Sequence, residues 1–190
     1  ENLKTLREIN PMLLSYNVEM TEVTGGTFWK AYTPEQIAGT EDFYVEPTSE
    51  GIAAMYKDLM QVYAPINLYD EKLRGLAKEL GPVWVRVSGT WATKTYYDFD
   101  GTTNGQVPEG YLNVLTKDQW IGVLDFVKAI GAKLIVSVAN CPGLHSADEP
   151  WDNTQAKMLM DYSIEHGVPV SAAEFTNEPN LIALSGLPQG

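Results

Sequence analysis

The residues with the clearest chemical potential are the carboxylates and amides that follow an apolar run near residue 170. The run begins at Val168 and leads through Glu174 to Asn177 and Glu178, where Pro179 ends it. An apolar run of this length predicts a short buried strand. Because unpaired buried charge is costly, a strand that ends this way indicates that its polar groups have partners. Glu178 is therefore a candidate catalytic carboxylic acid, with Asn177 as a hydrogen-bonding group beside it.

The Asn-Glu-Pro-Asn segment that begins at Asn177 also has a simpler interpretation. Asn and Pro are common turn formers, so the segment on its own equally predicts a turn. The elements before it distinguish the two interpretations, because a site requires several strands that end in polar groups at the same place.

A unit made of a polar cap, an amphipathic helix, a glycine and an apolar strand occurs three times. The units are Asp70, a helix to Leu80 and a strand over 83–87; Thr116, a helix to Ile130 and a strand over 133–139; and Asp152, a helix to about His166 and a strand from Val168 into Glu174. Alternation of this kind is typical of a parallel sheet. Strands that are apolar throughout predict that both faces of the sheet are covered.

An earlier strand is expected over 12–18, with Asn17 and Glu19 at its outgoing end. A long connection rich in Gly, Thr, Pro and aromatic residues follows from Thr21 to about Glu50, and a helix is expected over 51–63. Connections this long are usually functional or mobile. Most of the aromatic side chains of the connection are expected to pin it to the core. They are Phe28, Trp29, Tyr32, Phe43 and Tyr44.

The expected fold class is α/β, specifically the N-terminal half of a (β/α)8 TIM barrel that contains strands 1–4. A complete barrel needs about 250 residues, whereas the chain has 190, so we expect a fragment of a larger enzyme. Residues 13–190 would form the half-barrel and residues 1–12 an N-terminal segment. The four strand ends carry polar or small residues, which predicts a site where they meet. These are Asn17 and Glu19; Ser88, Gly89 and Thr90; Asn140; and Asn177 and Glu178.

The composition narrows the classes of partner. The formal net charge of −12 argues against nucleic acid and anionic membranes as partners. No apolar run approaches the roughly 20 residues that span a bilayer. The single Cys141 excludes an intrachain disulfide, and His145 and His166 have no partners at metal-binding spacing. Trp91, on a loop on the site side, is a candidate to stack on a sugar ring.

Four segments together resemble the heparanase-like β-glucuronidases, glycoside hydrolase family 79. Residues 174–180, Glu-Phe-Thr-Asn-Glu-Pro-Asn, are similar to the Glu-Leu-Gly-Asn-Glu-Pro-Asn segment of that family. Residues 73–82 followed by 85–90 resemble its first helix and its second strand, which ends in Arg-Phe-Gly-Gly-Thr. Asn10-Pro11 with Leu14-Ser15 resembles its first strand, and Leu134 to Asn140 its third. The similarity covers most of the chain in order and is weakest between Thr21 and Asn67.

The resemblance implies a (β/α)8 barrel with a small C-terminal β-sandwich, with which residues 1–12 are expected to pair. It implies a retaining hydrolase of β-linked glucuronic acid that needs no metal or organic cofactor and is secreted or periplasmic. Glu178 would be the general acid/base, and Asn177 would hydrogen-bond the 2-hydroxyl of the sugar. The family's nucleophile is a Glu on a late barrel strand, which implies a residue beyond Gly190. Retention requires two carboxyl groups about 5–5.5 Å apart.

The resemblance also implies roles for other strand ends. Glu19 stands where the family has a substrate-binding Asp, and Thr90 and Asn140 would line the substrate subsite. Two positions depart from the family pattern, because Thr176 replaces a Gly and Ser88 replaces the first Gly of the Gly-Gly pair.

The spacing separates Glu174 from the catalytic candidate. Glu174 lies two pleats before Glu178, so we expect it to be structural and to pair with Arg86, which would tie the second strand to the fourth.

Other functions remain open at this point. A related glycosidase acting on neutral β-linked polysaccharide would keep the barrel and Glu178. A catalytically inactive carbohydrate-binding relative would lack the nucleophile. The simplest alternative is an α/β domain in which Asn-Glu-Pro is a turn. The expected partners are a carbohydrate substrate and the remainder of the same enzyme.

Overall fold

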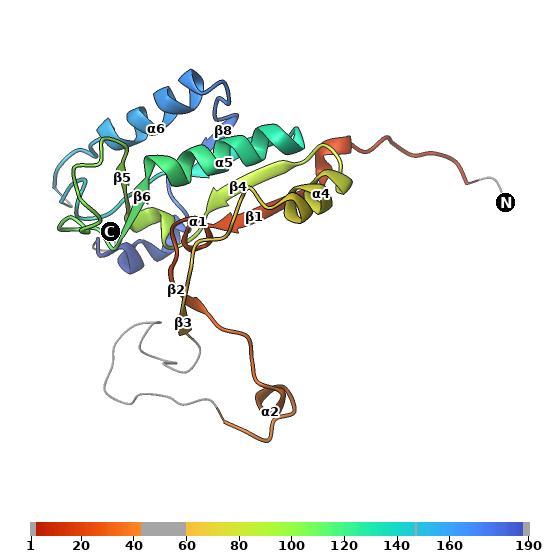
Figure 1. The fold of residues 1–190 in the computed structure, drawn as a ribbon, viewed down its shortest axis with the longest axis horizontal. Helices are drawn as coiled ribbons and strands as arrows, with labels where there is room; N and C mark the ends of the chain where they lie inside the picture. The colour runs from red at the N-terminus through yellow and green to blue at the C-terminus, as the bar shows by residue number, and fades with distance from the viewer. Residues whose placement is uncertain (1–2, 43–59, 147, 188–190) are drawn as a thin grey trace.

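The computed structural model describes residues 3–42, 60–146 and 148–187 as a mixed α/β fold around a parallel sheet (Figure 1). The sheet contains β1 (Ser15–Glu19), β4 (Trp84–Ser88), β7 (Lys133–Ser137) and β8 (Ala172–Glu174), in that order. Each neighbouring pair is parallel. Each strand of the sheet therefore lies beside the one that precedes it along the chain.

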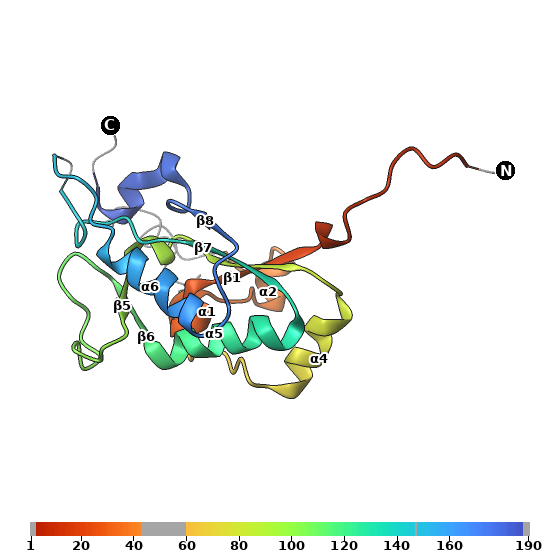
Figure 2. The same ribbon diagram turned by 90° about the horizontal axis from the view of Figure 1, so that it is seen from above.

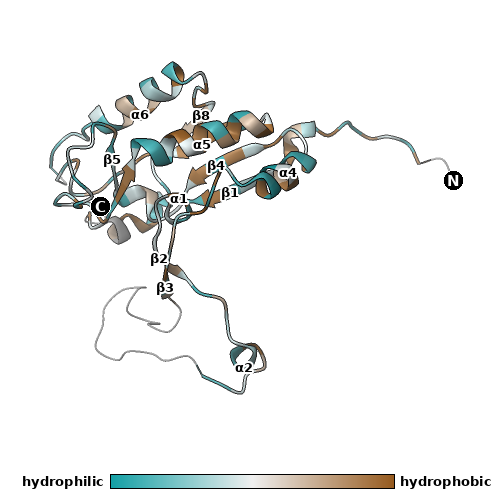
Figure 3. Ribbon diagram, viewed as in Figure 1, coloured by the Kyte–Doolittle hydropathy of each residue, from teal (hydrophilic) through white to brown (hydrophobic). Residues whose placement is uncertain are grey.

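Three helices connect these strands: α4 (Glu71–Glu79), α5 (Lys117–Ile130) and α6 (Thr154–Glu165). They lie on the same side of the sheet (Figures 1 and 2), and the apolar colouring is concentrated in β4 and parts of α5 (Figure 3). The core between the sheet and the helices includes Val85, Val87, Leu134, Val136, Trp120, Val127 and Leu159. The apolar side chains on one face of the sheet are therefore buried against the helices, which stabilises the fold.

The opposite face of the sheet departs in part from the expectation that both faces are covered, although Ser88 and Ser137 on this face are buried. Side chains alternate along a strand, so Arg86 and Ser88 point away from α4, α5 and α6. Arg86 keeps 29% of its side chain exposed. Trp84 and Ile135 share this face, and their apolar character concealed the alternation in the sequence.

The predicted caps of α4 and α5 are confirmed. The Asp70 carboxylate accepts the Leu73 N–H at 2.7 Å. Thr116 is the predicted cap of α5, and Gln119 completes a capping box with it, with backbone-to-side-chain bonds of 2.9 and 3.3 Å. Gly131 ends α5 in the left-handed conformation, with φ of 69°, where a side chain would add strain.

The start of α6 differs from the prediction. Asn153 is the N-cap residue, and Asp152 instead accepts the Thr154 N–H at 2.8 Å. Gln155 does not complete a capping box, because its side chain bonds the backbone N–H of Tyr97 at 2.6 Å. A tertiary contact therefore replaces the local one, and it ties α6 to β5 (Thr95–Asp98).

The N-terminal segment also departs from the prediction. Residues 11–13 form the 3₁₀ turn η1 (Pro11–Leu13), because the side chain of Asn10 accepts the Met12 N–H at 2.9 Å. β1 therefore begins at Ser15 rather than at residue 12. Residues 3–10 extend away from the sheet (Figures 1 and 2), and their pairing with a β-sandwich stays a prediction.

The long connection contains structure of its own. It forms α1 (Met20–Thr24), β2 (Gly26–Trp29) and α2 (Pro34–Ile37), and β2 pairs antiparallel with β3 (Met60–Tyr63). Residues 60–63 were expected to be helical, so that prediction is wrong. Backbone pairing with β2 decides their conformation. Residues 51–59, Phe43 and Tyr44 lie outside the described residues.

The remaining elements lie near the carboxyl ends of the strands. They are η3 (Ala92–Lys94), η4 (Pro179–Ser185) and β6 (Asn113–Thr116), which pairs in parallel with β5. Within the described ranges, no helix is both long enough and apolar enough to cross a bilayer.

Two leucines, one buried and one exposed, test this description of the core. Leu134 is fully buried between the sheet and the helices, whereas Leu112 is 65% exposed. We expect Leu134→Ala to lower the free energy of unfolding by about 2–5 kcal/mol, because it leaves a cavity. The control Leu112→Ala should change it by less than about 0.5 kcal/mol. Urea denaturation of both variants measures the difference, and equal effects would contradict the assigned core.

Candidate active site

The carboxyl ends of the four parallel strands lie at one edge of the sheet, and the candidate residues follow them (Figure 1). The register pairs Glu19 with Ser88, and Ser137 with Glu174. Paired residues of parallel strands point to the same face of the sheet. These four polar side chains therefore share the face that α4, α5 and α6 leave open.

Arg86 of β4 makes hydrogen bonds to three residues on this face. Its Nε and Nη2 donate to the two carboxylate oxygens of Glu174 at 2.8 and 2.7 Å, which confirms the predicted pair. Its Nη1 donates to Asn17 Oδ1 at 2.6 Å, and Nη2 also donates to Asn177 Oδ1 at 3.0 Å. One guanidinium therefore joins β1, β4, β8 and the segment after β8, in the bidentate geometry that favours Arg–carboxylate pairs.

Two serines complete the coordination of Glu174. Ser137 Oγ donates to Glu174 Oε2 at 2.6 Å, and Ser88 Oγ hydrogen-bonds Ser137 Oγ. The guanidinium of Arg86, followed by the Ser137 hydroxyl, lowers the pKa of Glu174. Arg86 also bonds Asn177, so Glu174 and Asn177 share one guanidinium.

The carboxylate of Glu178 is held by two neighbours. Asn177 Nδ2 and Thr90 Oγ1 both donate to Glu178 Oε2, at 3.1 and 3.3 Å. Glu178 is exposed and has left-handed backbone angles of φ 47° and ψ 62°. A non-glycine residue in this region costs about 1 kcal/mol or more, and such strain is concentrated at functional sites.

Glu19 lies at the end of β1 against the loop that follows β4. Its side chain is half-buried, and its backbone N–H donates to Glu22 Oε2 at 2.8 Å at the start of α1. Burial raises the pKa of Glu19 to about 7. Gly89, with φ of 104°, has no room for a side chain, because a Cβ there would lie 1.7 Å from Glu19 Oε2. The side chain of the preceding residue, Ser88, does not meet Glu19 in this way, because it hydrogen-bonds Ser137.

Asn140 follows β7 and belongs to a separate set of contacts. It is buried, its N–H donates to the Thr93 carbonyl at 3.0 Å, and its Oδ1 lies 2.7 Å from His145 Nε2. The structure thus brings Glu178, Asn177 and Thr90 into direct contact and places Asn140 at a neighbouring strand end. His145 as its partner could not be predicted from spacing alone.

The predicted stacking residue Trp91 is half-buried. Its ring meets Phe28 edge-on, at 5.2 Å between centroids, and it packs against the core. On the β8 side, Trp151 donates its indole N–H to the Ala139 carbonyl at 3.0 Å and meets the exposed Phe175 at 5.0 Å. Sugar stacking by Trp91 stays a prediction.

The sequence identified Asn17 and Ser88 as polar groups at strand ends but did not identify Ser137. The signal for Ser137 was its phase, since its side chain lies on the same face of the sheet as Glu174. That phase becomes visible only when the strand register is known.

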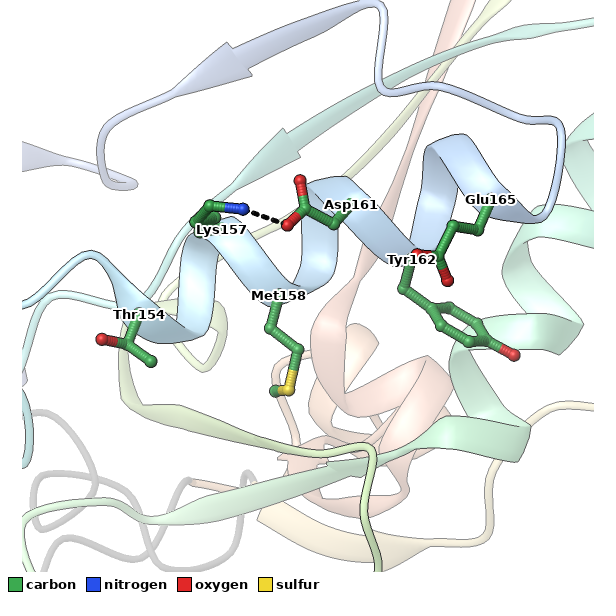
Figure 4. Close-up of a pocket in the computed structure, with 6 residues that line it drawn as sticks. All are labelled: Thr154, Lys157, Met158, Asp161, Tyr162 and Glu165. Atoms are coloured by element: carbon green, nitrogen blue, oxygen red, sulfur yellow. Dashed lines mark hydrogen bonds and ion pairs between the residues drawn. The ribbon is translucent and has the colours of Figure 1, made fainter.

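A groove along α6 lies apart from this cluster. Its six lining residues all belong to that helix, and an ion pair joins Lys157 to Asp161 (Figure 4). The other lining residues are Thr154, Met158, Tyr162 and Glu165. In the part of the chain that the structure describes, His, Cys, Asp and Glu side chains form no group of three or more that could hold a metal ion.

Comparison with known proteins adds no assignment: no family model and no curated protein matches the chain.

The lowered pKa of Glu174 predicts a pH-dependent contribution to stability. Because the folded state favours the ionised carboxylate, this contribution is present above the ordinary pKa of 4.5 and is lost as the pH falls through the lower folded value. We expect Glu174→Gln to cost about 1 kcal/mol above pH 4.5, since the pair is partly solvent-screened. The cost should shrink in acid. Denaturation at a series of pH values measures it, and a cost independent of pH would contradict the ion pair.

Glu19 predicts the opposite pH dependence. Its folded pKa of about 7 exceeds the ordinary 4.5, so the folded state retains a proton that the unfolded chain releases. Stability should fall as the pH rises from 4.5 to 7 and then become constant. Glu19→Gln should remove this loss, so the free energy of unfolding of the variant should rise relative to that of the wild type between pH 4.5 and 7. The exposed control Glu165→Gln should show no such gain, and a flat difference for Glu19→Gln would contradict the burial of its carboxyl group.

Proposed function

We propose that this chain is the first half of the catalytic (β/α)8 barrel of a retaining β-glucuronidase similar to glycoside hydrolase family 79. The observation that carries the proposal is the carboxylate of Glu178, which Asn177 and Thr90 hold at the point where the carboxyl ends of parallel strands meet. Active sites of parallel barrels are built at this end of the strands.

The order of the strands supports a barrel. In a doubly wound sheet the strand order reverses at a switch point and helices cover both faces. Here the order β1-β4-β7-β8 follows the chain, and α4, α5 and α6 lie on one side (Figure 2). Successive addition of strands with helices on one face is the pattern of a (β/α)8 barrel.

The hydrogen bonds around Glu178 suit a general acid/base. Both donors bind Oε2, which leaves Oε1 to carry the proton that is transferred to the glycosidic oxygen. The nucleophile, a carboxylate on a later strand of the same enzyme, would bond to the anomeric carbon as the leaving group departs. Ionised Glu178 would then take a proton from the water that hydrolyses this intermediate.

Arg86 fixes the orientation of Asn177. Because the amide oxygen accepts from Arg86, the amide nitrogen must face Glu178. An amide nitrogen carries two hydrogens, so one remains available to a sugar hydroxyl. This supports the proposed contact between Asn177 and the 2-hydroxyl group, a contact that strengthens in glycosidase transition states.

One observation favours a second candidate function, hydrolysis of a neutral β-linked glycan. Arg86 is the cation that reaches Asn177, and its guanidinium already makes four hydrogen bonds, to Glu174, Asn17 and Asn177. Since a guanidinium has five N–H donors, one remains, and a uronate carboxylate would need further donors elsewhere in the enzyme. The choice of glucuronic acid therefore rests on the resemblance and not on this cluster.

The test is hydrolysis of phenyl β-D-glucuronide by the complete enzyme, with phenyl β-glucoside and β-xyloside for comparison. We expect selective turnover of the glucuronide and a loss of about 10²–10⁴-fold in kcat for Glu178→Gln, as for removal of a general acid. The loss should be smaller for dinitrophenyl β-glucuronide, whose leaving group needs no protonation. Added azide should restore turnover and give the β-glucuronosyl azide.

The matched control is Glu165→Gln on α6, which should retain wild-type rates. Turnover of only a neutral glycoside, still lost in Glu178→Gln, would support the second candidate function. Full activity of Glu178→Gln on every substrate would contradict the assigned acid/base.

A further inference from the structure

A second pocket opens between α1 and the ribbon formed by β2 and β3. Its volume is about 360 Å³, within the range of about 300–1,000 Å³ that is usual for small-molecule sites. The lining residues are Thr21, Glu22, Phe28, Trp29, Tyr63, Ala64 and Ile66. None of them was singled out as a site residue by the sequence motif around Glu178.

The walls of this pocket are held together by local contacts. The Ile66 N–H donates to the Glu22 carbonyl at 2.9 Å, and the Tyr63 hydroxyl donates to the Trp29 carbonyl at 2.7 Å. Gly25, at φ 74°, lets the two chain segments approach, since a Cβ there would lie 2.8 Å from Pro65 Cδ. The aromatic groups are therefore presented by a fixed scaffold.

The pocket is connected to the candidate active site through contacts of its wall. α1 starts immediately after Glu19, and Phe28, in the pocket wall, meets Trp91 at 5.2 Å between ring centroids. Trp91 directly follows Thr90, which donates to Glu178. A chain of two contacts thus links the pocket to the carboxylate of Glu178.

The lining chemistry selects a neutral, polyhydroxylated ligand with an apolar face. Trp29 is 40% exposed and, with Tyr63, offers an aromatic surface. Glu22 is the charged residue among the lining groups. Its Oε2 accepts the Glu19 N–H at 2.8 Å, a carboxylate has further acceptor sites for hydroxyl groups, and its charge repels a uronate or a sulfate.

We propose that this pocket binds a neutral pyranose unit of the glycan whose glucuronide linkage Glu178 cleaves. The inference rests on the proposed function. Trp29 would contact the C–H face of the sugar ring, and Glu22 would accept hydrogen bonds from its hydroxyl groups. The substrate would then combine a glucuronic acid at the cleaved bond with uncharged sugars beside it.

Direct binding to the complete enzyme tests the pocket independently of hydrolysis. The probes are cellotriose and xylotriose, with a trisaccharide of glucuronic acid as the charged counterpart, each measured by isothermal titration calorimetry. We expect at least one neutral trisaccharide to bind and Trp29→Ala to weaken it by about tenfold or more, as for the loss of a central aromatic contact. Trp29→Phe should retain part of the affinity, and Tyr32→Ala, an exposed aromatic outside the pocket, should retain all of it.

The outcomes separate the two proposals. Binding that depends on Trp29 supports the pocket even if no glucuronide is cleaved, in which case only the proposed function fails. The proposal is overturned if neither neutral trisaccharide binds, if Trp29→Ala binds as the wild type does, or if Trp29→Ala weakens the uronic acid trisaccharide instead.

Discussion

The arrangement of the candidate site depends on the ion pair between Arg86 and Glu174. The two residues lie on strands separated by β7 and share the face of the sheet that the helices leave open. Either charge without the other would be partly buried and uncompensated, which is costly. Their bidentate contact pairs both charges, and a further Nη2 hydrogen of Arg86 orients Asn177. A structural interaction therefore sets the direction of a group beside Glu178.

Around this pair the protein retains two unfavourable features. Glu178 has a left-handed backbone, and Glu19 keeps its carboxyl group half-buried with a pKa near 7. Neither feature stabilises the fold, since both strain and desolvation cost free energy. They persist because the surrounding strands and the close approach of Gly89 determine their positions. Natural proteins usually retain unfavourable features of this kind at functional sites.

Local patterns predicted those parts of the fold that depend on neighbouring residues. The caps at Asp70 and Thr116 and the stop at Gly131 follow from hydrogen bonds within a single turn. The prediction failed where a distant segment competes for the same groups. Gln155 bonds the backbone of Tyr97 instead of capping α6, and residues 60–63 pair with β2 as a strand.

The sequence by itself predicted the four parallel strands with the three helices between them, the polar groups at the strand ends, and Glu178 as a candidate acid. It also indicated the pair of Arg86 with Glu174, because a buried charge needs a partner. The tertiary structure alone decided which oxygen of Glu178 is held, that Asn17 shares the guanidinium, and that α1 and the β2–β3 ribbon enclose a pocket. These features depend on strand register and on contacts between distant segments. Neither can be predicted from the periodicity of residues along the chain.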